Sequence, residues 1–163
     1  MRPPPPGRVE EVAAPYFRWR EAGYEVTVAS LKGGEIPFDP ASKGSDFLTP
    51  QADAFLKDAA AAKAVADSVP LEAVLGGELE RYDAIFLPRG HGIMYDGPGD
   101  AHLKQALETL WAAGKVVAAV CHGPAGLVDA CGPDGELIVK GRCGGLGSSA
   151  RVPHAAFCMS SWR

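Results

Sequence analysis

The sequence predicts one α/β domain in which a mostly parallel, doubly wound sheet carries helices on both faces. First, helical and strand patterns alternate from residue 9 to residue 130, an order that implies right-handed crossovers between parallel strands. Second, residues 83–88 and 116–120 are nearly continuous apolar runs, typical of strands covered on both faces. Third, 163 residues suffice for one domain with a core.

The first half of the chain begins with apolar residues at helical spacing over residues 9–22, and Gly23 follows as a left-handed stop. Residues 24–30 are short and rich in β-branched side chains, which predicts a strand. Prolines and small polar residues over 36–45 indicate a surface loop. The alanine-rich stretch 49–65 favours one or two short helices.

The second half contains the two buried strands. Residues 71–79 are expected to form a connector with a small strand and a turn, and 83–88 then form the first buried strand. Helical spacing returns over 100–113, with Gly114 closing that helix. The second buried strand, 116–120, leads directly into Cys121.

A further helix is expected over residues 123–130, with Pro124 in its first turn, where the missing N–H is harmless. Ligands of parallel sheets bind beyond the carboxyl ends of the strands. The segments 90–92 (Gly-His-Gly) and 121–123 (Cys-His-Gly) both follow such ends. We therefore expect them to lie at one edge of the sheet.

The two ends of the chain break this pattern. Residues 1–8 are a proline-rich segment, 9–142 form the α/β domain, and 143–163 are aperiodic and expected to be a disordered tail. No segment before residue 9 supplies the first, usually central, strand of such a sheet. We therefore expect the sheet to lack that strand and its C-terminal elements.

Composition excludes several classes of partner. Lys and Arg number 16 against 20 Asp and Glu, with mixed signs and a net charge of −4, so nucleic acid is not expected. Apolar runs fall well short of the roughly 18 residues that span a bilayer, and no secretory signal is evident. None of the four cysteines shows metal-ligand spacing. We expect a cytoplasmic protein with reduced thiols, no metal and no cofactor.

Cys121 is the strongest candidate for a reactive group. Between a buried strand and a helix N-terminus, free backbone N–H groups and the helix dipole favour the thiolate. The N–H of His122 is placed to stabilise an oxyanion, and Gly90 is a plausible second donor. The alternative is a small buried hydrophobic residue, but Cys-His-Gly-Pro is a poor core segment and a good nucleophile elbow.

The remaining candidates each have a structural alternative. His122 either orients toward the thiolate or is a structural hydrogen-bonding residue, and His91 either lines a pocket or occupies a loop tip. Glu11 lies in the first turn of a helix, where a carboxylate interacts favourably with the dipole in any case. Asp96 is expected to cap a loop.

Three motifs carry a family resemblance: Ala-Val-Cys-His-Gly-Pro-Ala at 119–125, Gly-His-Gly-Ile-Met-Tyr-Asp at 90–96 and Glu-Val-Ala-Ala-Pro-Tyr-Phe at 11–17. Together they resemble the ThiJ/PfpI superfamily, in the branch of glutathione-independent (class III) glyoxalases and their chaperone-like relatives. The resemblance covers about residues 7–142.

The resemblance implies a flavodoxin-like fold, usually a homodimer. It also implies Cys121 as the nucleophile, His122 beside it and Glu11 in contact with the sulfur. Gly90 matches the oxyanion-hole glycine, and we expect His91, Gly92 and Gly123 to complete the substrate-binding site. Arg89 stands where the family usually has a small residue.

The activity implied is that of a lyase converting methylglyoxal to lactate, hence methylglyoxal detoxification. One alternative is a hydrolase of the class I glutamine amidotransferase type, although Ala119 stands where those proteins have glycine. Another is a redox-sensing or chaperone-like stress-response protein with an oxidisable Cys121. A third is an inactive truncated form, because relatives add a first strand and a C-terminal acidic partner for the histidine.

Overall fold

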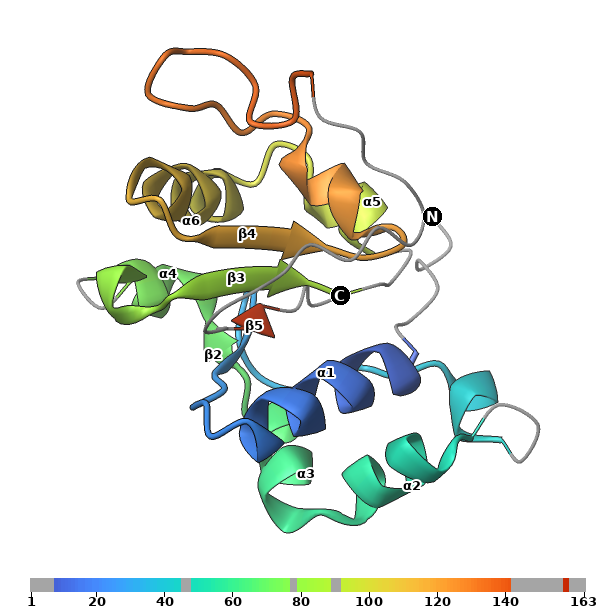
Figure 1. The fold of residues 1–163 in the computed structure, drawn as a ribbon. Helices are drawn as coiled ribbons and strands as arrows, with labels where there is room; N and C mark the ends of the chain where they lie inside the picture. The colour runs from blue at the N-terminus through green and yellow to red at the C-terminus, as the bar shows by residue number, and fades with distance from the viewer. Residues whose placement is uncertain (1–7, 45–47, 77–78, 89–91, 142–156, 159–163) are drawn as a thin grey trace.

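The computed structural model describes residues 8–44, 48–76, 79–88, 92–141 and 157–158 (Figure 1). The elements follow in the order α1 (Glu10–Glu21), β1 (Val28–Ser30), η1 (Pro40–Lys43), α2 (Pro50–Lys57), α3 (Ala59–Ala66), β2 (Val69–Pro70), α4 (Leu71–Leu75), η2 (Leu79–Arg81), β3 (Ala84–Leu87), α5 (Ile93–Asp96), α6 (Ala101–Ala112), β4 (Val116–Ala119), η3 (Gly123–Leu127) and β5 (Phe157–Cys158). Helices and strands alternate as the sequence predicts.

The named strands pair in parallel throughout the described ranges. One sheet has the order β2-β1-β5, and the other pairs β3 with β4 from Ala84↔Val116 to Leu87↔Ala119. The parallel α/β architecture predicted from the apolar runs is therefore confirmed. No helix among the described residues is long and apolar enough to cross a membrane.

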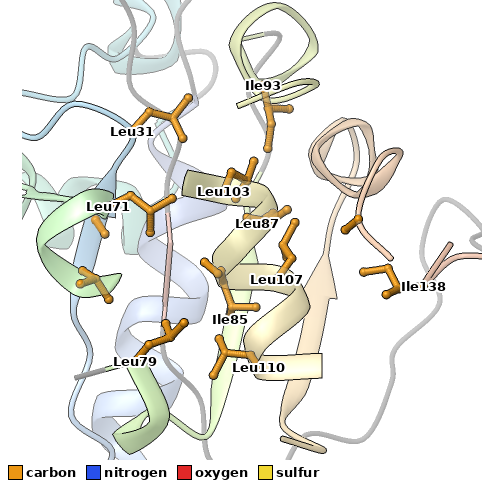
Figure 2. Packing of buried hydrophobic residues seen from close by; sticks show 14 residues of the cluster. Leu31, Leu71, Leu79, Ile85, Leu87, Ile93, Leu103, Leu107, Leu110 and Ile138 are labelled. Atoms are coloured by element: carbon orange, nitrogen blue, oxygen red, sulfur yellow. The ribbon is translucent and has the colours of Figure 1, made fainter. Parts of the chain in front are cut away.

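Two hydrophobic cores lie on opposite faces of the strands. Side chains alternate along β3, so that Ile85 and Leu87 enter one core while Phe86 packs against the other. The first core includes the leucines of α6, which Figure 2 shows packed over Ile85 and Leu87. The second core is formed mainly by α1, α2 and α3, which lie on the other side of the strands in Figure 1. Burial on both faces explains the nearly continuous apolar runs.

The helix boundaries follow local chemistry. Gly23 and Gly114 take φ values of 87° and 70° just after α1 and α6, as expected for left-handed stops. Asp100 caps α6 by accepting a hydrogen bond from the Leu103 N–H at 2.8 Å. Both long helices were predicted within two residues of their observed ends.

Several elements differ from the prediction. β1 covers only residues 28–30 of the expected 24–30, and residues 71–75 form helix α4, because Leu71 and Val74 point at helical spacing into the first core. The expected helix at 123–130 is a 3₁₀ turn ending at Leu127. Within the aperiodic segment 143–163, residues 157–158 form β5, which pairs with β1, and the rest of that segment lies outside the described residues.

Candidate active site

The turn after β4 has the backbone of a nucleophile elbow. Cys121 has φ of 56°, and every other residue with positive φ in the described ranges is glycine. The Val120 N–H donates to the Leu87 carbonyl at 3.0 Å, so the chain stays paired with β3 up to the elbow. The Gly123 N–H then donates to the Val120 carbonyl at 2.8 Å and closes the turn. A left-handed cysteine costs of order 1–2 kcal/mol, and such strain clusters at functional sites.

Gly123 allows the elbow to pack directly on the end of β3. A Cβ atom at this position would lie 2.3 Å from the Leu87 carbonyl oxygen and 3.2 Å from the Ala119 Cβ. No side chain fits that space, because real Cβ contacts do not fall below about 3 Å. Pro124 follows as the second residue of η3. A glycine at position 123 is therefore required by the turn.

The side chains of Cys121 and His122 lie together at this elbow. Cys121 Sγ is 3.5 Å from His122 Nδ1, and both residues are half-buried. A ring nitrogen at this distance can take a proton from the thiol or donate one to the thiolate, depending on the tautomer. The pair therefore has the geometry of a nucleophile with an adjacent base.

Glu11 lies in the first turn of α1 and is half-buried, with its Oε2 atom shielded from solvent. The N-terminal end of α1 lies on the same side of the molecule as the carboxyl ends of β3 and β4, at the right in Figure 1. The first turn of α1, which contains Glu11, therefore lies on the same side of the molecule as the end of β4. The expected contact between Glu11 and the sulfur stays a prediction.

The Gly-His-Gly segment is described only from its third residue onward. Gly90 and His91 lie outside the described residues, so their expected roles stay predictions. Gly92 is buried, and its carbonyl accepts hydrogen bonds from the Tyr95 and Asp96 N–H groups at 2.8 and 3.2 Å. Gly92 therefore begins α5, the short helix that packs against η3.

Asp96 is an acidic group whose setting the sequence did not reveal. Its Oδ1 atom is buried and makes no hydrogen bond to a described residue, and Asp96 is the last residue of helix α5 instead of the loop residue that was predicted. Burial raises the pKa of Asp96 to about 6, with the Asp100 carboxylate acting in the same direction and Lys32 against it. The sequence signal for the burial of Asp96 was the apolar residue Ile93, three positions earlier. Ile93 is buried, and residues three apart lie on the same face of a helix.

Within the described ranges, no group of three or more His, Cys, Asp or Glu residues could hold a metal ion. The described free cysteines are Cys121 and Cys131, both half-buried. Cys131 does not lie at a strand end, and its Sγ is 3.8 Å from the Asp129 carbonyl oxygen. Cys131 is therefore a useful internal reference for Cys121.

Comparisons with known proteins agree with this geometry. The sequence profile of the DJ-1/PfpI family matches residues 8–137. The chain is 34% identical to the glutathione-independent glyoxalase hsp3101 of Schizosaccharomyces pombe, over 81% of this chain and 54% of that protein. It is also 34% identical to the glutathione-independent glyoxalase HSP31 of Saccharomyces cerevisiae, over 82% of this chain and 56% of that protein.

Among solved structures, glyoxalase III from Candida albicans superposes with a TM-score of 0.71 at 30% identity, covering 82% of this chain and 55% of that one. The chain thus spans about half the length of the curated relatives it matches.

Proposed function

Because this chain belongs to the DJ-1/PfpI family, we propose that it acts as a glutathione-independent glyoxalase that converts methylglyoxal to lactate through the Cys121 thiolate. The observation that carries the proposal is the left-handed Cys121 at the end of β4, with its sulfur 3.5 Å from His122 Nδ1. The relatives named as glutathione-independent glyoxalases support the same substrate class, a small aldehyde.

The proposed reaction begins with addition of the Cys121 sulfur to the aldehyde carbon of methylglyoxal, which gives a hemithioacetal. A base then removes the proton from that carbon, and a proton is delivered to the neighbouring carbon. The hemithioacetal thereby becomes a thioester of lactate. Water hydrolyses the thioester, releasing lactate and regenerating the thiol, so the net reaction consumes one water and no cofactor.

Two groups are proposed as the base for this proton shift. His122 is favoured by its contact with the sulfur, because a group beside the bound substrate carbon can reach its proton. Glu11 is favoured by its place in the first turn of α1, which lies on the same side of the molecule as the end of β4, and by the shielding of its Oε2 atom from solvent. The two bases differ in charge, because the imidazole acts in its neutral form and the carboxylate in its negative form. The dependence of the rate on pH, measured for Glu11→Gln and for His122→Ala, therefore separates their contributions.

The oxyanion that forms on sulfur addition needs hydrogen-bond donors. We propose the backbone N–H of His122 as the first donor, because in nucleophile elbows the N–H of the residue after the nucleophile contributes to the oxyanion hole, with the N–H of Gly90 as the second donor. His91, Gly92 and Gly123 complete the proposed substrate-binding site. A homodimer remains the proposed assembly, to be measured by light scattering of the purified chain.

The direct test is lactate formation from methylglyoxal by the purified chain without glutathione. Cys121→Ala is expected to reduce the rate by at least about 100-fold, because removing a covalent nucleophile eliminates the first step. Cys131→Ala is the matched control, since it removes a thiol that is also half-buried and should retain the rate within about twofold. Retained activity in Cys121→Ala would remove the nucleophile assignment.

A further inference from the structure

We propose that β5, residues 157–158, is the central strand of one continuous sheet in the order β2-β1-β5-β3-β4. In this sheet β5 fills the gap between β1 and β3, which we call the slot. This inference concerns how the sheet is completed and is independent of the reaction proposed above. The hydrogen-bonded ladders alone divide the strands into two sheets, β2-β1-β5 and β3-β4. β5 lies at the boundary between them.

The pairing of β5 accounts for one side of the slot. Val28 is the ladder partner of Phe157 and Ala29 that of Cys158, in parallel. On the other side, Cα atoms of β5 approach those of β3 to within 8 Å. In Figure 1, β5 is the short red arrow beside β3, close to β1 and β2. A strand with neighbours on both sides occupies an internal position in a sheet.

The packing of side chains shows that β1 and β3 belong to one layer. Ala29 of β1 enters the first core together with Ile85 and Leu87 of β3. Val28 of β1 enters the second core, against which Phe86 of β3 packs. Each strand thus sends alternate side chains to the same two cores, as neighbouring positions of one sheet do. The space between the strands must then lie within the plane of the sheet.

A side-chain contact bridges the start of this slot. The Tyr82 hydroxyl donates to Thr27 Oγ1 at 3.0 Å, linking the residues just before β3 and β1. Two strands that are separated by one intervening strand lie about 10 Å apart, which is about twice the distance between adjacent strands. A long phenol side chain reaching a threonine across that span is what a one-strand gap predicts.

Leaving the slot between β1 and β3 empty would cost free energy. The edges of β1 and β3 that face each other lie between two cores, where unpaired backbone N–H and C=O groups are costly. β5 supplies partners along β1 from within the same polypeptide. It thereby joins the part of the sheet next to α1, which carries Glu11, to the β3–β4 part, which carries Cys121.

The register of β5 can be tested by disulfide formation in the full chain. Cys158 is retained, Cys121, Cys131 and Cys143 become Ser, and either Ala29→Cys or Val28→Cys is added. In the parallel register Ala29 is the ladder partner of residue 158, whereas Val28 is the partner of residue 157, so a cysteine at position 29 is the better placed of the two to cross-link to position 158. An intramolecular disulfide is expected at least about tenfold faster in the Ala29→Cys variant. Equal rates, no disulfide, or a disulfide between two chains would each overturn the proposal.

A second measurement covers the case in which these cysteine variants fold poorly. Phe157→Pro removes a backbone donor from β5, whereas His154→Pro places the same residue three positions before it. Hydrogen exchange over residues 28–30 is expected to rise at least about tenfold in Phe157→Pro and to stay within twofold in His154→Pro, with exchange over residues 116–119 unchanged in both. Unchanged exchange at residues 28–30 in Phe157→Pro would contradict the proposal.

Discussion

Cys121 and Gly123 together determine the backbone of the turn that carries a thiol at the end of β4. Cys121 takes the left-handed conformation that raises its side chain above the strand end, and Gly123 lets the chain return against Leu87. Cys121 adopts a strained backbone conformation, and the missing side chain of Gly123 avoids a clash with the Leu87 carbonyl oxygen. The motif Cys-His-Gly therefore reflects the steric demands of the turn as well as the chemistry of the thiol.

Gly123→Ala should consequently destabilise the protein and abolish lactate formation. Its added methyl group would collide with the Leu87 carbonyl oxygen, and relief requires a shift of the elbow or of β3. We expect a loss of about 2 kcal/mol or more in the free energy of unfolding, measured by urea titration. Gly76→Ala is the control, because its φ of −67° suits alanine and its nearest neighbour lies at 3.5 Å. Equal losses in both variants would refute this account of Gly123.

Asp96 gives the stability a pH dependence of known sign. Its folded pKa of about 6 exceeds the ordinary value of 3.8, so its contribution to stability is full below that ordinary value and is lost as pH rises through 6. Asp96→Asn removes the buried charge. The variant should be more stable than the wild type by about 1 kcal/mol at pH 7.5, a figure reduced for partial exposure, with the difference vanishing near pH 4.

Melting curves at several pH values measure this difference. Asp67→Asn is the matched control, because Asp67 is exposed and its ion pair with Lys63 at 2.8 Å lies at the surface. Such pairs contribute little, so the control should change stability by less than about 0.5 kcal/mol across the range. A larger gain for Asp96→Asn at pH 4 than at pH 7.5 would reverse the sign and disprove the assignment.

At the scale of elements, the sequence predicts best where the signal is local. The apolar runs at 83–88 and 116–120 become β3 and β4, and helical spacing with a following glycine gives α1 and α6. The four-residue helix α5 is too short to show a period. β5 could not be predicted, because its strand conformation depends on pairing with β1, more than 120 residues away in sequence.

The contact between the residues that precede β1 and β3 is open to a double-mutant cycle. Tyr82→Phe, Thr27→Ala and the double variant remove the 3.0 Å hydrogen bond from either or both sides. We expect a coupling energy of about 0.5–1.5 kcal/mol in urea unfolding, because the groups are partly buried and face each other. Additive single effects would mean that this bond does not hold the two parts of the sheet together.

For the whole molecule, the parallel strands place the ends of β3 and β4 at one edge of the sheet, where Cys121 follows β4. The first turn of α1, which contains Glu11, lies on the same side of the molecule in Figure 1, although it is more than 100 residues earlier in the sequence. The elbow could be predicted from the residues around Cys121. The place of Glu11 could be predicted only from the family resemblance, because a glutamate in a first helical turn has an ordinary role in any protein.

The most direct test of the central claim compares alkylation of Cys121 and Cys131 in the folded chain. Iodoacetamide labelling followed by peptide mapping reads both thiols in one sample. Because Cys121, unlike Cys131, follows a strand end and has a histidine ring nitrogen 3.5 Å from its sulfur, we expect it to react at least about tenfold faster than Cys131. The ratio should approach one in 8 M urea, where about equal exposure removes the difference. Equal rates in the folded chain would contradict the assignment of Cys121 as the nucleophile.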